Sequence, residues 1–248
     1  MGMLTYNKCP YFGKLINVAC KLMTDLNQKF LDAYSTAFPL KTVYTDSFPL
    51  EMKASEKDNE GWIEWKPIEG TLQESDYNKL EKEFGVLFPK SFINWHKAYY
   101  FLGADCSIIR LPSSSPTTLL ESLKQTINWF IPEQLIPQKI YPFADEGNDT
   151  GPLVFDGREP VPDNEFPICV YDNSYGGDLD GLSEIIFSSF SKLLECLTHY
   201  LTELKTRKNF EIIPDFFQID PTGAGTTGVD YWLSWTGMQK ANFEEFGY

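Results

Sequence analysis

Apolar residues recur every three to four positions in the first part of the chain. Between residues 13 and 38 they are spaced as on one face of a helix: Leu15, Val18, Leu22, Leu26, Phe30, Tyr34 and Phe38. This period predicts an amphipathic helix. Residues 39–61 are polar and rich in turn formers, which is typical of a linker. We therefore expect residues 1–60 to form a helical extension followed by a linker.

The middle of the chain carries clear signals for further helices. Thr71 and Glu74 have the spacing of a capping box, and Gly85 suits a left-handed helix end. Ser188 or Ser189 is placed to cap a later, strongly apolar helix. The predicted helices cover residues 71–84, 89–101, 116–130 and 188–204.

Short β-branched and aromatic runs lie between these helices, separated by Gly, Asn, Asp and Pro, and they predict strands. The predicted strands cover residues 108–111, 140–144, 153–155 and 166–171. Helices, then clustered strands, then a helix are typical of an α+β domain, which we place at residues 61–205. We expect the remaining residues, 206–248, to form a C-terminal β-hairpin whose strands cover 211–219 and 231–235.

Negative charge is the strongest signal in the composition. The net charge is −14, and residues 141–204 hold thirteen acids against only Arg158 and Lys192, which gives this segment −11. Such a balance argues against nucleic acid and anionic membranes as partners, because both are bound largely through Lys and Arg. A concentrated negative field instead favours encounter with a cationic protein. Solubility alone is the competing explanation of the charge.

No motif in the sequence indicates a catalytic or cofactor site. His96 and His199 both lie in apolar helical stretches, and no nucleophile elbow, HExxH helix or P-loop is present. Gly223, Gly225 and Gly228 spell GxGxxG, but a strand rather than a helix is expected after them, which disfavours a dinucleotide loop. We therefore expect a protein that is not an enzyme and holds no cofactor.

The cysteines are odd in number and widely separated, and they form no CxxC pair: Cys9, Cys20, Cys106, Cys169 and Cys196. This arrangement predicts neither a disulfide framework nor a zinc site. The apolar stretch from Leu15 to Met23 is too short to span a bilayer and lacks a signal-peptide cleavage site. We therefore expect no metal and a cytoplasmic location.

One series of short motifs resembles the SUKH superfamily, in its Smi/Knr branch. A helix with the pattern E-x-x-x-G-x-x-x-P is followed by a strand with P-F-A-D-E-G, a strand ending in Asp, and a final S-F helix. The segments that carry the resemblance are 65–68, 80–92, 140–149, 153–156, 167–172 and 187–194. The resemblance covers about residues 62–204.

The resemblance implies a central, twisted, mostly antiparallel sheet with helices packed around it. It also implies a non-enzymatic binding protein, because many members are immunity proteins that neutralise toxins, often nucleases, while fungal members are scaffolds. Acidic side chains would mimic the phosphates that a cationic nuclease grips. The oligomeric state stays open.

We expect the partner, a cationic protein toxin domain, to be bound by the acids of the strand ends, with two tryptophans as aromatic anchors. The candidate residues are Asp145, Glu146, Asp149, Asp156, Asp172, Asp178, Asp180, Trp62 and Trp65. The alternatives are an interaction scaffold that docks another protein through the N-terminal helix, and a hydrolase that uses a carboxylate pair.

Overall fold

The computed structural model describes residues 10–247, with side chains at Met23 and from Asp25 onward. The helices are α1 (Pro10–Ala37), α2 (Glu74–Phe84), α3 (Lys90–Ala98), α4 (Glu121–Ile127), α5 (Phe130–Leu135), α6 (Phe190–Glu203), α7 (Asn209–Ile212), α8 (Phe216–Ile219) and α9 (Val229–Phe246). The strands are β1 (Lys41–Val43), β2 (Trp62–Glu64), β3 (Ile68–Glu69), β4 (Tyr99–Tyr100), β5 (Ala104–Asp105), β6 (Ile109–Leu111), β7 (Ile140–Glu146), β8 (Pro152–Asp156) and β9 (Ile168–Val170).

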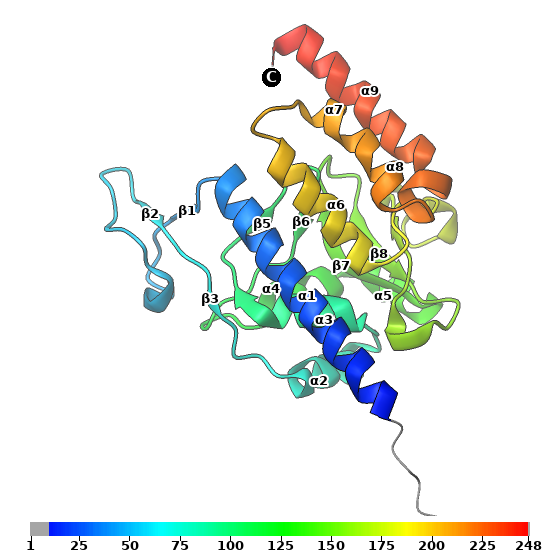
Figure 1. The fold of residues 1–248 in the computed structure, drawn as a ribbon, viewed down its shortest axis with the longest axis horizontal. Helices are drawn as coiled ribbons and strands as arrows, with labels where there is room; N and C mark the ends of the chain where they lie inside the picture. Colours follow the sequence, from blue (N-terminus) through cyan, green and yellow to red (C-terminus); the bar gives the residue numbers. More distant parts are fainter. Residues whose placement is uncertain (1–9, 248) are drawn as a thin grey trace, which may run out of the picture.

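The architecture is mixed α+β, as the sequence predicts. Strands β5 to β9 form an antiparallel sheet in sequence order, and two small two-stranded antiparallel sheets pair β1 with β2 and β3 with β4. Figure 1 shows α1 and α6 lying side by side, α7 to α9 gathered beyond them, and the β1–β2 hairpin projecting from the body. We call this hairpin, residues 41–66, the arm.

The central sheet buries apolar side chains on both of its faces. On one face Phe143 of β7 stacks on Phe155 of β8 at 3.9 Å, and both meet Phe92 of α3 and Phe190 of α6 edge to face. On the other face Val154 packs in a separate cluster formed with α5. Because side chains alternate along a strand, a strand that is buried on both faces is apolar at nearly every position, as β7 and β8 are.

The helix predicted over residues 71–84 is present as α2, although its capping box is displaced. α2 begins at Glu74, and the carboxylate of Asp76 accepts the backbone N–H of Gln73 at 3.0 Å. Thr71 instead exchanges a 2.7 Å hydrogen bond with the hydroxyl of Tyr100. Gly85 ends the helix at φ 71°, as predicted. The predicted capping pair was therefore wrong, because a tertiary partner occupies the threonine hydroxyl.

Two predicted helices are shorter than their sequence pattern. The helix expected over 89–101 is α3, which ends at Ala98 because the next two residues pair with β3 as β4. The helix expected over 116–130 is reduced to α4, and α5 starts separately at Phe130. Leu119, at φ 43°, keeps the preceding turn out of the helix. Ser189 caps α6, accepting the backbone N–H of Lys192.

The C-terminal β-hairpin prediction was wrong. Residues 209–246 form helices α7, α8 and α9 with a π turn over Gly223–Thr227. Trp232 is fully buried, contacts Phe187 and Phe216, and donates its indole N–H to the carbonyl of Ile186 at 3.1 Å. The aromatic content favoured strands locally, but burial of tryptophans three residues apart, Trp232 and Trp235, requires a helix.

The glycines of the GxGxxG sequence serve close packing. A Cβ at Gly223 would collide with the backbone nitrogen of Ser188, and one at Gly225 with the carbonyl of Phe217. A helix, α9, does follow this turn, contrary to expectation, but the element before it is α8 rather than a strand. The strand–turn–helix arrangement of a dinucleotide site is therefore missing from this described segment.

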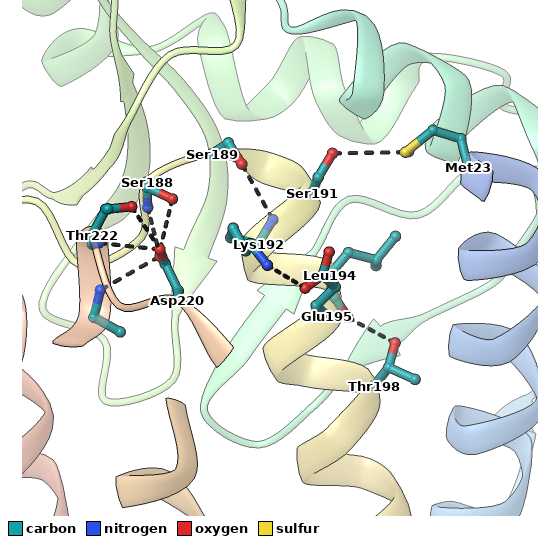
Figure 2. Close-up of polar contacts among 12 residues, drawn as sticks. Met23, Ser188, Ser189, Ser191, Lys192, Leu194, Glu195, Thr198, Asp220 and Thr222 are labelled. Atoms are coloured by element: carbon teal, nitrogen blue, oxygen red, sulfur yellow. Dashed lines mark hydrogen bonds and ion pairs between the residues drawn. The ribbon is translucent and has the colours of Figure 1, made fainter. Parts of the chain in front are cut away.

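Asp220 anchors the end of the chain, residues 206–247, to the rest of the fold (Figure 2). We call this segment the C-terminal extension. Its side chain is fully buried and accepts the backbone N–H and the hydroxyl of Ser188 at 2.7 and 2.6 Å. It also accepts the backbone N–H groups of Gly223 and Ala224 and the hydroxyl of Thr222. One buried side chain thus ties the start of α6 to the turn that leads into α9, through hydrogen bonds from both segments.

Replacing this carboxylate should loosen the extension. We expect Asp220→Asn to lower the free energy of unfolding by about 3 kcal/mol, because an amide presents a donor to a ring of donors. Urea denaturation followed by tryptophan fluorescence measures the change. The matched control is Asp230→Asn at the exposed start of α9, for which we expect less than about 1 kcal/mol. Equal effects of the two substitutions would contradict the anchoring role.

Candidate functional site

A row of charged side chains crosses three strands at one end of the central sheet. Asp105 of β5 lies opposite Arg110 of β6, which lies opposite Asp145 of β7. Directly paired residues of antiparallel strands point to the same face of the sheet. Their strand neighbours, such as Ala104 and Ile109, point inward and are buried. The alternation of each strand therefore brings these three charges together on the outer face.

The turn between β7 and β8 adds a fourth charge. Asp149, at φ 62°, forms an ion pair with Arg110, and Arg110 also donates to the carbonyl of Glu146 at 2.8 Å. The hydrogen bond to Asp149 and the negative charge of that residue raise the pKa of Arg110 above its ordinary value. We call Asp105, Arg110, Asp145 and Asp149 the acidic row. Three carboxylates against one guanidinium leave it with an excess of negative charge.

The pKa of Asp145 reports the crowding in this row. Although the residue is exposed, partial loss of solvent around its carboxylate raises its pKa above the ordinary value. The negative charge of Asp149 raises it further, and the positive charge of Arg110 opposes both. The ionised form of Asp145 is therefore less favourable than that of an ordinary aspartate, and a cation brought close to it would stabilise that form.

Glu146, the neighbour of Asp145, does not belong to this surface. It is only 2% exposed, and its carboxylate accepts the backbone N–H groups of Asn148 at 2.7 Å and Thr150 at 3.4 Å. The hydroxyl of Tyr231 lies 3.3 Å from its other oxygen. The prediction of Glu146 as a partner-binding residue was therefore wrong, because its carboxylate holds the turn from inside.

Three predicted acids lie in the loop that follows β9, beside the turn between β7 and β8 (residues 147–151), which we call the acidic turn. The backbone N–H of Asn173 in this loop donates to the carbonyl of Thr150 at 3.1 Å. Asp172 accepts the N–H of Ser174, and these bonds lower its pKa. Asp178 accepts the N–H of Asp180, which is exposed. The loop therefore extends the negative surface while two of its carboxylates close their own turns.

Asp156 lies apart from the acidic row. It is at the far end of β8, opposite Ile140, whereas Asp145 is opposite Pro152 at the turn end. Arg158 pairs with it through two side-chain bonds of 2.8 and 2.6 Å. Although partial burial alone would raise the pKa of Asp156, the bonds and charge of Arg158 bring it below the ordinary value. This acid is neutralised within the chain.

The two predicted tryptophan anchors have different surroundings. Trp65 is 4% exposed and belongs to the core, whereas Trp62 is 42% exposed. Trp62 lies on β2 of the arm, directly opposite Val43, which is also exposed. The structure therefore leaves Trp62 as the accessible one of the pair and places it in a different sheet from the acidic row.

Sequence reasoning missed Asp105 and Arg110. Together with Ser107 and Gly147 they line one side of a hollow of about 360 Å³, whose other side is formed by Tyr34, Phe38 and Pro39. The signal for Arg110 was available, because it is a lone base between Ile109 and Leu111 in a predicted strand and must point away from the core. The cross-strand register, which joins it to Asp145, was not available.

A larger groove of about 500 Å³ lies between α2 and the segment that leads into α4. Its charged rim contains the pairs Lys79–Asp76 and Lys124–Glu83, at 3.3 and 3.8 Å. It holds none of the predicted site residues.

Both histidines, the residues best suited to acid–base chemistry, contact other side chains of the fold. His96 is fully buried, with its Nδ1 2.6 Å from the hydroxyl of Tyr77, and burial lowers its pKa to about 4. His199 lies 2.8 Å from Asp215, which also pairs with Arg207.

Other reactive groups are similarly occupied or buried. Burial raises the pKa of Glu165, which accepts the backbone N–H and the hydroxyl of Ser91 at the start of α3. Cys106, Cys169 and Cys196 are buried thiols, while the side chains of Cys9 and Cys20 lie outside the described residues. Within the described part of the chain, no three His, Cys, Asp or Glu side chains gather as metal ligands.

Comparison with known proteins gives no match: neither a protein-family model nor a curated protein corresponds to this chain. The resemblance to the SUKH superfamily therefore stays a prediction. Among the described helices, none has the length and apolar character needed to cross a bilayer.

Removing the base of the acidic row should move the titration of its neighbour. We expect Arg110→Ala to raise the pKa of Asp145 further, because the opposing positive charge is lost. Since this pKa is already raised in the folded state, Asp145 opposes folding at neutral pH, and the penalty is relieved as the pH falls through that pKa. Carboxyl NMR titration measures the shift. Arg158→Ala, which removes the partner of Asp156, is the control and should leave Asp145 unchanged.

The buried histidine predicts acid sensitivity. Folded His96 stays neutral down to about pH 4, whereas an unfolded histidine binds a proton below about pH 6.5. Stability should therefore fall as the pH drops from about 6.5 to 4, by about 3 kcal/mol from this residue. Urea unfolding of the parent and of His96→Gln at pH 7 and pH 4 isolates the contribution. An identical pH dependence in both proteins would contradict it.

Proposed function

We propose that this protein is a non-enzymatic immunity protein that neutralises a cationic toxin domain in the cytoplasm through the acidic row. The observation that carries the proposal is the placement of Asp105, Asp145 and Asp149 around the single base Arg110 on one outer face of the sheet. The net charge of −14 supports it, because a field of one sign speeds encounter with a partner of the other.

The resemblance to the SUKH superfamily supports the same function. An antiparallel sheet with helices packed on it is the architecture that the resemblance implies. One of the resembling segments, residues 140–149, contains both Asp145 of β7 and Asp149 of the turn that follows it. A nuclease toxin is the partner that this chemistry fits best, because carboxylates spaced along a surface can occupy the cationic groove meant for phosphates.

Two alternatives receive less support. A scaffold that docks another protein through the N-terminal helix needs a free apolar face, yet Phe30, Leu31 and Tyr34 of α1 are buried in the chain's own core. A hydrolase needs a carboxylate pair free to act on a substrate, yet Glu165 binds the start of α3 and Glu146 binds its own turn.

Charge reversal tests the proposal. We expect the double variant Asp145→Lys/Asp149→Lys to weaken binding by about 100-fold, because two attractive contacts become repulsive. The binding partner to use is the purified toxin-like end of the large secreted protein expected beside this gene, with calorimetry across a salt series and a growth-protection assay in cells that express the toxin.

The matched control is Glu121→Lys/Glu133→Lys, which makes the same charge change at exposed positions of α4 and α5. Circular dichroism checks that both double variants fold. If both weaken binding equally, the net charge and not the acidic row recognises the partner. If the parent protein neither binds nor protects, the immunity function is wrong.

A further inference from the structure

The C-terminal extension reaches the acidic turn from the side opposite Arg110. α9 contributes Tyr231, whose hydroxyl lies 3.3 Å from the carboxylate of Glu146. The indole N–H of Trp235 donates to the same hydroxyl at 3.0 Å. One turn further along, the sulfur of Met238 lies 3.7 Å from the side-chain amide of Asn148. One face of α9 therefore lies along the turn between β7 and β8.

Tyr231 is held in a fixed position and in a fixed protonation state. Its ring packs against Trp232 at 5.0 Å, and Trp232 is fully buried. Burial, and then the charge of Glu146, raise the pKa of Tyr231. The phenol therefore keeps its proton, and because Trp235 already donates to its oxygen, that proton is free to be donated to Glu146.

Glu146 connects Tyr231 to the backbone of the turn. One carboxylate oxygen faces Tyr231, and the other accepts the backbone N–H groups of Asn148 and Thr150. Between these two amides lies Asp149 in the left-handed region, at φ 62°, which an aspartate adopts at some cost. The same buried carboxylate thus fixes both flanks of the residue that pairs with Arg110.

We propose that the C-terminal extension is a brace for the acidic turn, and that Tyr231 is the positioning residue through which it acts. Tyr231 orients Glu146, Glu146 fixes the backbone on both sides of Asp149, and Asp149 is thereby presented beside Arg110 for a partner. The existence of the brace is independent of function, while its effect on binding rests on the proposed function.

The test uses the full chain and the variant Tyr231→Phe. Amide hydrogen exchange resolved at Asn148 and Thr150 should speed up about tenfold, because Glu146 loses the donor that orients it. Binding of the toxin domain should weaken by a similar factor. The matched control is Tyr100→Phe on β4, in another sheet, which removes a buried hydroxyl that is hydrogen-bonded to Thr71. It should leave exchange at the turn unchanged.

A second variant covers the case in which Tyr231→Phe fails to fold. Glu146→Gln keeps the shape of the side chain and weakens its acceptor, so it should also speed exchange at both amides. Combined with Tyr231→Phe, it should add little further, since both act through one contact. Full additivity, or unchanged exchange in either single variant, would overturn the brace. If exchange becomes faster but binding does not weaken, the brace remains as a structural feature. Its proposed role in presenting the turn to a partner would then be overturned, and the turn would no longer belong to the proposed binding surface.

Discussion

The fold depends on a sheet that is buried on both faces. The stacked pair Phe143–Phe155 joins α3 and α6 to one face, and Val154 joins α5 to the other. Burial of each phenylalanine ring of this pair stabilises the fold by roughly 1.5–3 kcal/mol. Because both faces of β7 and β8 are covered along most of their length, charged side chains are confined to the strand ends and turns. The acidic row lies at the end of the sheet, where helices no longer cover the strands.

The balance of charge in that row follows from the strand register. Had β7 paired with β6 one residue out of step, Glu146 would face solvent and Asp145 the core. The observed register instead gives the inward carboxylate two backbone donors and a tyrosine hydroxyl, and it gives the outward one a neighbouring arginine. Two adjacent acids therefore differ in role because they lie on opposite faces of one strand.

Local patterns were sufficient to predict most elements of the middle region and failed where long-range contacts decide. The helix end at Gly85 was predicted correctly, and so was a cap at Ser188 or Ser189, which the structure places at Ser189, since a helix cap depends on the neighbouring residues. Trp232 was misread as part of a strand, because its burial depends on Phe187, which lies 45 residues earlier in the sequence. For the site, the strand and turn around Asp149 were predictable, but its pairing with Arg110 needed the sheet order.

The position of α6 has a consequence for how the chain is made. α1 packs on one side of α6, and α7 and α8 pack on another, so both extensions share one central helix. The hydroxyl of Ser191 lies 3.6 Å from the sulfur of Met23, 168 residues away. α1 must therefore wait for a partner that is synthesised much later. A fragment cut to residues 61–205 would expose apolar surface on both flanks of α6 and would be prone to aggregate.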